Sequence, residues 1–272
     1  MTGLSPAKAR IAERGVLENP SPRAGLSLMF AVGERPSASD IERLLDSESA
    51  ANVAVQISHR PEESAGWLEL LTSGLALDLA GLAPAGGTDA PPASHHFGTS
   101  PDIGSFALEA IALTPGPHLE GAGGMLPVVR TMAGIAADLV AAFPVKAVCW
   151  NPSASWMAPD YFTRIVTNWL SGGPFPALGL TAVTPASEGA VESVGLNYFT
   201  GQELRVEGAS DDTVAETVKT AVRVIDYLIG QGPLTAIQEI EGPSGQPLLA
   251  EPSADGRQVR VWQGVRQWPS PH

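Results

Sequence analysis

The stretch from Gly116 to Asn151 constrains the fold more than any other part of the chain. On a helical wheel at about 100° per residue, the run from Met125 to Phe143 places large side chains on one face and small ones on the opposite face. The first face carries Met125, Val129, Met132, Ala136, Leu139 and Phe143, all large apart from Ala136, and the opposite face carries Gly134, Ala137 and Ala141. Only Arg130, Thr131 and Asp138 form a polar wedge. The pattern predicts a central helix that is buried on two sides.

The residues around this helix predict its ends. Glycines at 121, 123 and 124 precede it, Pro127 suits a first helical turn, and Pro144 stops the helix. Apolar runs at 106–114 and 145–150 are typical of buried strands. The result is a strand, helix, strand unit, with a right-handed crossover if the two strands are parallel neighbours.

The rest of the chain alternates short strands with two more long helices, predicted at about 159–170 and 212–230. A shorter helix follows the capping-box spacing of Ser39 and Glu42, and hairpins are expected at 67–79 and 192–207. Three main helices can bury their apolar faces only against the sheet. We therefore expect an α+β fold with one continuous, mixed and mainly antiparallel sheet covered by helices at about 125–143, 159–170 and 212–230; an α/β fold is the alternative.

The predicted domain organisation is simple. Residues 1–24 are expected to form a flexible arm, residues 25–264 a single α+β domain, and residues 265–272 a tail. Within the domain, residues 83–104 are rich in Pro, Gly, Ala, Ser and Thr, which predicts a long surface loop. The two halves share a loose order of strand, helix, strand and hairpin, which is weak evidence for a duplication.

Composition excludes several classes of function. With 44% hydrophobic and 17% charged residues the chain can bury a core. A net charge of −13 disfavours nucleic acid and anionic membranes, and favours a basic protein surface as partner. The single cysteine excludes an internal disulfide and a multi-cysteine metal site. No secretory signal or membrane-spanning stretch is visible, so we expect a cytoplasmic protein.

Four motifs in the second part of the chain carry a resemblance. They are A-V-C-W after the central helix, the helix start P-D-Y-F, the segment G-L-N-Y-F-T-G-Q-E-L-R-V-E, and the helix end Y-L-I-G-Q-G. Over residues 106–263 the chain resembles a family of uncharacterised bacterial domains, one of the "domain of unknown function" families. The motifs are structural in character, and the resemblance implies no chemistry for individual residues.

Cys149 and His118 are the candidate catalytic pair. Cys149 lies at the end of a predicted strand, and His118 is the only candidate base for making its thiolate. Free cysteines are more often buried structural residues, and that interpretation is favoured.

His118, Glu120 and Arg130 form the best polar group, beside a glycine-rich helix start that could hold a small anion. The alternative is a solvated loop in which Glu120 stabilises the helix dipole. Asn151 and Trp156, in the turn after Cys149, are further candidate ligand-binding residues. No metal-ligand spacing occurs around His95 and His96, and no cofactor motif is present.

The sequence leads to two functional hypotheses. The favoured hypothesis is a non-enzymatic binding or protein-interaction module, because scaffold signals are strong and no coherent catalytic motif is visible. The alternative is a small-molecule hydrolase or transferase that uses Cys149 with His118. The sequence does not determine the oligomeric state.

Overall fold

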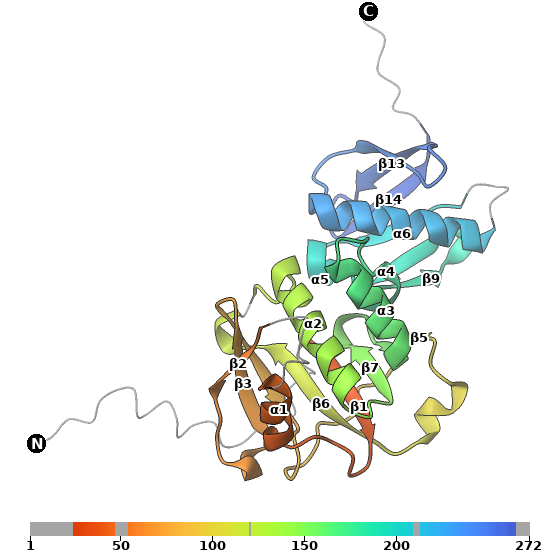
Figure 1. Ribbon diagram of the computed structural model, residues 1–272. Helices are drawn as coiled ribbons and strands as arrows, with labels where there is room; N and C mark the ends of the chain where they lie inside the picture. The colour runs from red at the N-terminus through yellow and green to blue at the C-terminus, as the bar shows by residue number, and fades with distance from the viewer. Residues whose placement is uncertain (1–23, 47–53, 120, 209–212, 265–272) are drawn as a thin grey trace, which may run out of the picture.

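The computed structural model describes residues 24–46, 54–119, 121–208 and 213–264. The predicted tail, and the predicted arm apart from Ala24, lie outside these ranges. The described strands form two sheets rather than one (Figure 1).

The first sheet has eight strands in the order β2-β3-β4-β6-β1-β7-β8-β5. The strands are β1 (Leu26–Ala31), β2 (Gln56–His59), β3 (Trp67–Thr72), β4 (Leu75–Ala80), β5 (His95–Phe97), β6 (Leu108–Pro115), β7 (Ala147–Trp150) and β8 (Ser155–Met157). Only β5 and β8 pair in parallel. Because β6 and β7 both pair antiparallel with β1, they run in the same direction with β1 between them.

The second sheet has six strands in the order β12-β13-β14-β11-β10-β9. The strands are β9 (Ala182–Pro185), β10 (Val191–Val194), β11 (Glu203–Val206), β12 (Gln238–Glu241), β13 (Pro247–Pro252) and β14 (Gln258–Gln263). Only β11 and β14 are parallel, and a helix lies between them in the chain.

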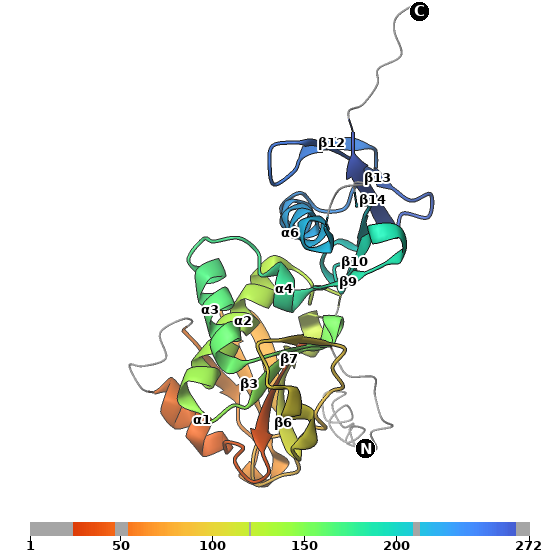
Figure 2. The same ribbon diagram turned by 90° about the vertical axis from the view of Figure 1, so that its right-hand side faces the viewer.

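The described ranges contain six α-helices: α1 (Ala38–Leu45), α2 (Leu126–Ala142), α3 (Pro159–Leu170), α4 (Ala177–Leu180), α5 (Asn197–Thr200) and α6 (Val214–Gln231). α2 packs on β1, β6 and α3, whereas α6 packs on β9, β10 and β11 (Figure 2). The α+β class, the mainly antiparallel pairing and the three main helices that cover the sheet are confirmed. The expectation of one continuous sheet is wrong, since the strands divide between two. Among the described residues, no helix is both long and apolar enough to cross a membrane.

The central helix is buried almost all round, as its wheel predicts. Nine of its residues, from Val128 to Leu139, are buried, including Gly134. Arg130, Thr131 and Asp138 are partly exposed, as expected, but Ala141 is exposed. One apolar core continues from this helix through the six-stranded sheet, where it includes Leu204 and Val261.

Two local predictions need correction. The segment at 83–104 contains strand β5, and Pro91 accepts a hydrogen bond from Trp156 Nε1 at 3.0 Å, so the segment covers the sheet rather than forming a plain surface loop. Helix α1 is capped by Ser37 with Asp40, two residues before the predicted Ser39 and Glu42. The same kind of capping box, Thr213 with Glu216, begins α6.

Candidate functional site

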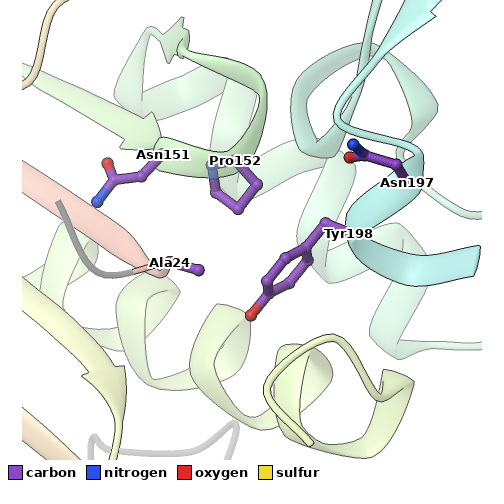
Figure 3. Close-up of a pocket in the computed structure, with 5 residues that line it drawn as sticks. All are labelled: Ala24, Asn151, Pro152, Asn197 and Tyr198. Atoms are coloured by element: carbon purple, nitrogen blue, oxygen red, sulfur yellow. The ribbon is translucent and has the colours of Figure 1, made fainter. Parts of the chain in front are cut away.

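Two adjoining pockets lie where the two sheets meet, and we call them together the junction groove. One, of about 370 Å³, is lined by Ala24, Asn151, Pro152, Asn197 and Tyr198 (Figure 3). The other, of about 560 Å³, shares Ala24, Asn197 and Tyr198 and is completed by Pro115, Gly116, Pro117, Leu119, Gly121, Gly123 and Gly124. In Figure 3, Ala24 and Asn151 lie on one side of Pro152, while Asn197 and Tyr198 lie on the other.

The topology explains where the groove lies. Strands β6 and β7 run in the same direction, so their carboxyl ends meet at one edge of the sheet. β6 ends at Pro115 and β7 ends at Trp150, directly before the lining residues Gly116 and Asn151. Crevices outside the carboxyl ends of parallel strands are common ligand sites in open sheets. The opposite wall is α5, which belongs to the six-stranded unit.

Helix α5 is held in place by the carboxylate of Glu203. Its Oε1 accepts hydrogen bonds from the backbone N–H groups of Gly195 at 2.9 Å and Asn197 at 3.3 Å. Its Oε2 accepts from the Leu196 N–H at 3.3 Å and from the Ser193 hydroxyl. A carboxylate bound by several donors at a helix start fixes that turn. Glu203 therefore positions Asn197 and Tyr198 in the groove.

The glycines before α2 allow Tyr198 to approach closely. A Cβ atom added at Gly124 would lie 2.1 Å from the Tyr198 carbonyl oxygen. A Cβ atom at Gly123 would lie 2.8 Å from the Tyr198 hydroxyl oxygen. Both distances are shorter than any real contact, so the sequence at 123–124 is fixed by packing against α5.

Two polar atoms beside the groove are buried without a hydrogen-bond partner in the described structure: the indole nitrogen of Trp150 and the hydroxyl of Tyr198. Their rings meet edge to face, with centroids 5.5 Å apart at 78°. Burial raises the pKa of the Tyr198 hydroxyl, which is therefore a neutral donor near pH 7. A buried donor without a partner lowers the stability of the folded protein by roughly 1–3 kcal/mol. Such atoms are therefore rare, and each one calls for an explanation such as a functional role.

The groove is electrically neutral along its described lining. Its polar side chains are the amides of Asn151 and Asn197 and the Tyr198 phenol, and the other lining residues are Gly, Pro, Ala and Leu. Such a surface can donate and accept hydrogen bonds, but its lining offers no acid–base pair.

Asn151 is the predicted site residue that lines the groove. Its side-chain oxygen also accepts a 3.4 Å hydrogen bond from Ser27. His118 lies next to the lining, and its Nε2 accepts from the backbone N–H of Ala76 at 3.4 Å. Glu120 lies outside the described residues. The structure therefore brings Asn151 and His118 to the same end of the sheet, though only Asn151 faces the groove.

Arg130 does not line the groove, and its contacts are with helix α3. It donates a 3.1 Å hydrogen bond to the Leu170 carbonyl at the end of α3, and its guanidinium lies 4.7 Å from the Trp169 ring centroid. Both contacts tie α2 to α3. The structure does not place Arg130 with His118 in an anion site.

Cys149 lies on the opposite face of the sheet from Trp150. It is fully buried among Met29, Ala110, Ala147 and Trp156. Burial raises the pKa of its thiol to about 12. Trp156 covers it and is itself 7% exposed.

The structure does not bring Cys149 and His118 together. His118 bonds to Ala76 in β4, whereas Cys149 is in β7, and β6 and β1 lie between these strands. Three strand spacings of about 4.8 Å separate β4 from β7 by roughly 14 Å. A general base must be within hydrogen-bond reach of the group it activates.

The sequence-based prediction missed Asn197, Tyr198 and Glu203. All three lie in the segment G-L-N-Y-F-T-G-Q-E, which carries part of the family resemblance and for which the sequence predicts a hairpin. A four-residue helix between two short strands has too few residues for a periodic signal. The one available signal was Asn-Tyr followed by Gly201, whose φ of +76° ends the helix.

Across the described ranges, no group of three His, Cys, Asp or Glu side chains is arranged to hold a metal ion. Comparison of the chain with protein families, curated proteins and solved structures finds no match. The geometry of the groove is therefore the basis for a functional proposal.

Proposed function

We propose that this protein is a non-enzymatic binding module that holds an uncharged ligand in the junction groove. The observation that carries the proposal is the neutral described lining, in which Asn151, Asn197 and Tyr198 line a cavity walled by glycine and proline. Binding sites commonly combine an apolar wall with a few placed polar groups. The ligand would belong to a partner protein in a cytoplasmic setting.

The neutral lining argues against the other expected ligand, a small anion. A buried anion needs a cation or several free donors to replace its hydration. Arg130 is engaged with Leu170 and Trp169, and no described lining residue is basic. The acidic chain remains suited to a basic partner surface around the groove rather than to an anion inside it.

The alternative, catalysis by Cys149 with His118, has less support. The thiol is buried and its pKa is raised, and Cys149 lies in β7, whereas His118 bonds to β4, which is not a neighbour of β7. Nucleophilic cysteines need an electropositive or base-assisted setting.

An NMR titration of the ¹⁵N-labelled protein tests the proposal. The neutral probes are N-acetylglycine N-methylamide and methyl α-glucoside, and the charged probes are acetate and phosphate. We expect at least one neutral probe to shift the amide signals of residues that line the groove. Saturable shifts at the groove with the charged probes alone would contradict the proposal.

A pair of variants makes the titration specific. Asn197→Ala removes an exposed carboxamide from the groove, but the Asn197 backbone N–H that bonds to Glu203 stays. Asn168→Ala removes an exposed carboxamide from α3, outside the groove. We expect Asn197→Ala to weaken binding about fivefold, the effect of one lost hydrogen bond, with Asn168→Ala unchanged. Equal effects of both variants would place the ligand elsewhere.

A further inference from the structure

The Trp150 indole N–H and the Tyr198 hydroxyl are two buried donors without a partner in the described structure. Trp150 is fully buried and directly precedes Asn151, and Tyr198 lines both pockets of the groove. The other two tyrosine hydroxyls differ: Tyr161 donates to the Leu178 carbonyl at 2.7 Å and Tyr227 to Gln238 Oε1 at 3.0 Å. Tyr198 is thus distinguished from both of the other tyrosines.

The chemistry of the two donors restricts what can satisfy them. An indole nitrogen can only donate, so its partner must supply an acceptor oxygen. A carbonyl oxygen has two lone pairs and can accept from two donors at once. The two rings are in edge-to-face contact, so the side chains that carry the two donors are direct neighbours, and Tyr198 lines both pockets of the groove.

A carboxylate, a sugar and an amide could each offer such an oxygen. A carboxylate would be buried beside described lining residues that include no cation, at a high desolvation cost. A sugar is usually held by stacking on an open aromatic face, but Tyr198 has its hydroxyl buried and its ring in contact with Trp150 and Phe199. An amide is neutral, and its N–H can pair with the exposed Asn197 carboxamide.

We propose that the ligand is a peptide main chain, whose carbonyl oxygen accepts hydrogen bonds from the Tyr198 hydroxyl and the Trp150 indole N–H. This inference rests on the proposed function and specifies the ligand class of the same groove. The glycines at 121, 123 and 124 leave one wall without side chains, and a backbone can approach such a wall closely. Neither donor atom is exposed and Trp150 lines neither pocket, so the proposal requires the turn at Gly123, which packs against the Tyr198 hydroxyl, to move aside and open both donors to the groove.

The experiment compares Tyr198→Phe with Tyr161→Phe, which remove the same atom from two half-buried tyrosines. Denaturant midpoints are measured for both variants, and binding of N-acetylglycine N-methylamide is followed by NMR. Because no described residue hydrogen-bonds to its hydroxyl, Tyr198→Phe should keep or raise the midpoint and weaken binding of the amide about fivefold. Tyr161→Phe loses a hydrogen bond to Leu178, so its midpoint should fall while binding is kept.

The indole signal of Trp150 gives a second readout. We expect the amide probe to move this signal downfield, as hydrogen bonding to a carbonyl does, and methyl α-glucoside to leave it in place. Binding of the amide that is unaffected by Tyr198→Phe, or a fall in midpoint equal to that of Tyr161→Phe, would overturn the inference. Binding of methyl α-glucoside alone in the groove would overturn the peptide inference. The same result would support the proposed function, because the ligand would still be uncharged. Failure of both neutral probes to bind would contradict the proposed function itself.

Discussion

Gly124 shows how one residue sets the geometry of the site. Its missing side chain lets the Tyr198 carbonyl approach to a distance that no Cβ atom could tolerate. We expect Gly124→Ala to lower the free energy of unfolding by roughly 1–3 kcal/mol, the usual scale for overpacking. Gly104→Ala is the control, because a Cβ atom there meets nothing within 4 Å. Chemical denaturation measures the stability of both variants. If Gly124→Ala were as stable as Gly104→Ala, α5 would not pack on this turn.

Cys149 provides a clean chemical test because it is the only cysteine in the chain. The thiol is buried and its pKa is raised to about 12, so very little thiolate exists near pH 8. We expect no labelling of the folded protein by a thiol reagent and one label per chain after denaturation. Rapid labelling of the folded protein near neutral pH would favour the hydrolase or transferase hypothesis instead.

His95 makes stability depend on pH. Burial, and then the charge of His96, lowers the pKa of His95 below its ordinary value of 6.5. The unfolded chain therefore binds a proton first as the pH falls, and this favours unfolding. We expect the free energy of unfolding to decrease as the pH falls through about 6.5, and His95→Gln to flatten that decrease. Carboxyl groups with lowered pKa, such as Glu109 and Glu207, lose their contribution to stability as the pH falls through their ordinary value of 4.5 and below, so most of their effect lies at lower pH than that of His95.

Denaturation curves at pH 7.5 and pH 5.5 for the parent and for His95→Gln separate these contributions. A parent protein whose stability is the same at both values would contradict the assignment to His95.

At the scale of elements, α2 supports a prediction about glycine in a helix. Alanine is favoured over glycine in a helix interior by about 1 kcal/mol, so glycine is usually a liability. Gly134 is buried in a helix that contacts β1, β6 and α3. We expect Gly134→Ala to bring no gain and Gly134→Leu to destabilise by roughly 1–3 kcal/mol.

Gly230 is the matched case on an open surface. It lies in α6 with nothing within 4 Å of an added Cβ atom. Gly230→Ala should therefore stabilise by up to about 1 kcal/mol in the same denaturation assay. A stabilising Gly134→Ala together with a neutral Gly134→Leu would mean that this face of α2 is open to water.

Elements whose signal is local were predictable from the sequence. α2, α3 and α6 lie within a few residues of their expected positions, because an apolar stripe repeats over several turns and glycine or proline ends it. Pairing of distant strands was not predictable. β11 pairs with β14 across α6, and β5 pairs with β8 across α2, so no local pattern shows that two sheets form.

The candidate site was predicted only in part for the same reason. Asn151 follows a buried strand, and a polar residue there is visible in the sequence. Tyr198 reaches the groove because α5 packs on Gly124, a contact between segments far apart in the chain. Glu203 acts through backbone N–H groups, which leave no residue pattern to find.

At the scale of the whole molecule, the two sheet units meet through a chain of aromatic contacts. Trp169, Phe175, Phe199, Tyr198 and Trp150 follow one another with ring centroids between 5.1 and 5.5 Å apart. Each contact stabilises the junction beyond the area it buries, by roughly 0.5–1.5 kcal/mol. The groove lies beside the last of these contacts, between Trp150 and Tyr198. Its two walls come from different sheet units, and the aromatic contacts hold these units together.

The central claim is that ligand binds at the junction of the two sheet units. A crystal structure of the protein soaked with N-acetylglycine N-methylamide tests it most directly. We predict density for the probe in the junction groove, against Asn197 and Tyr198. Density instead in the pocket beside Trp156, which is lined by Pro91, His96 and Phe106, or next to Cys149 on the opposite face of the sheet, would contradict the account.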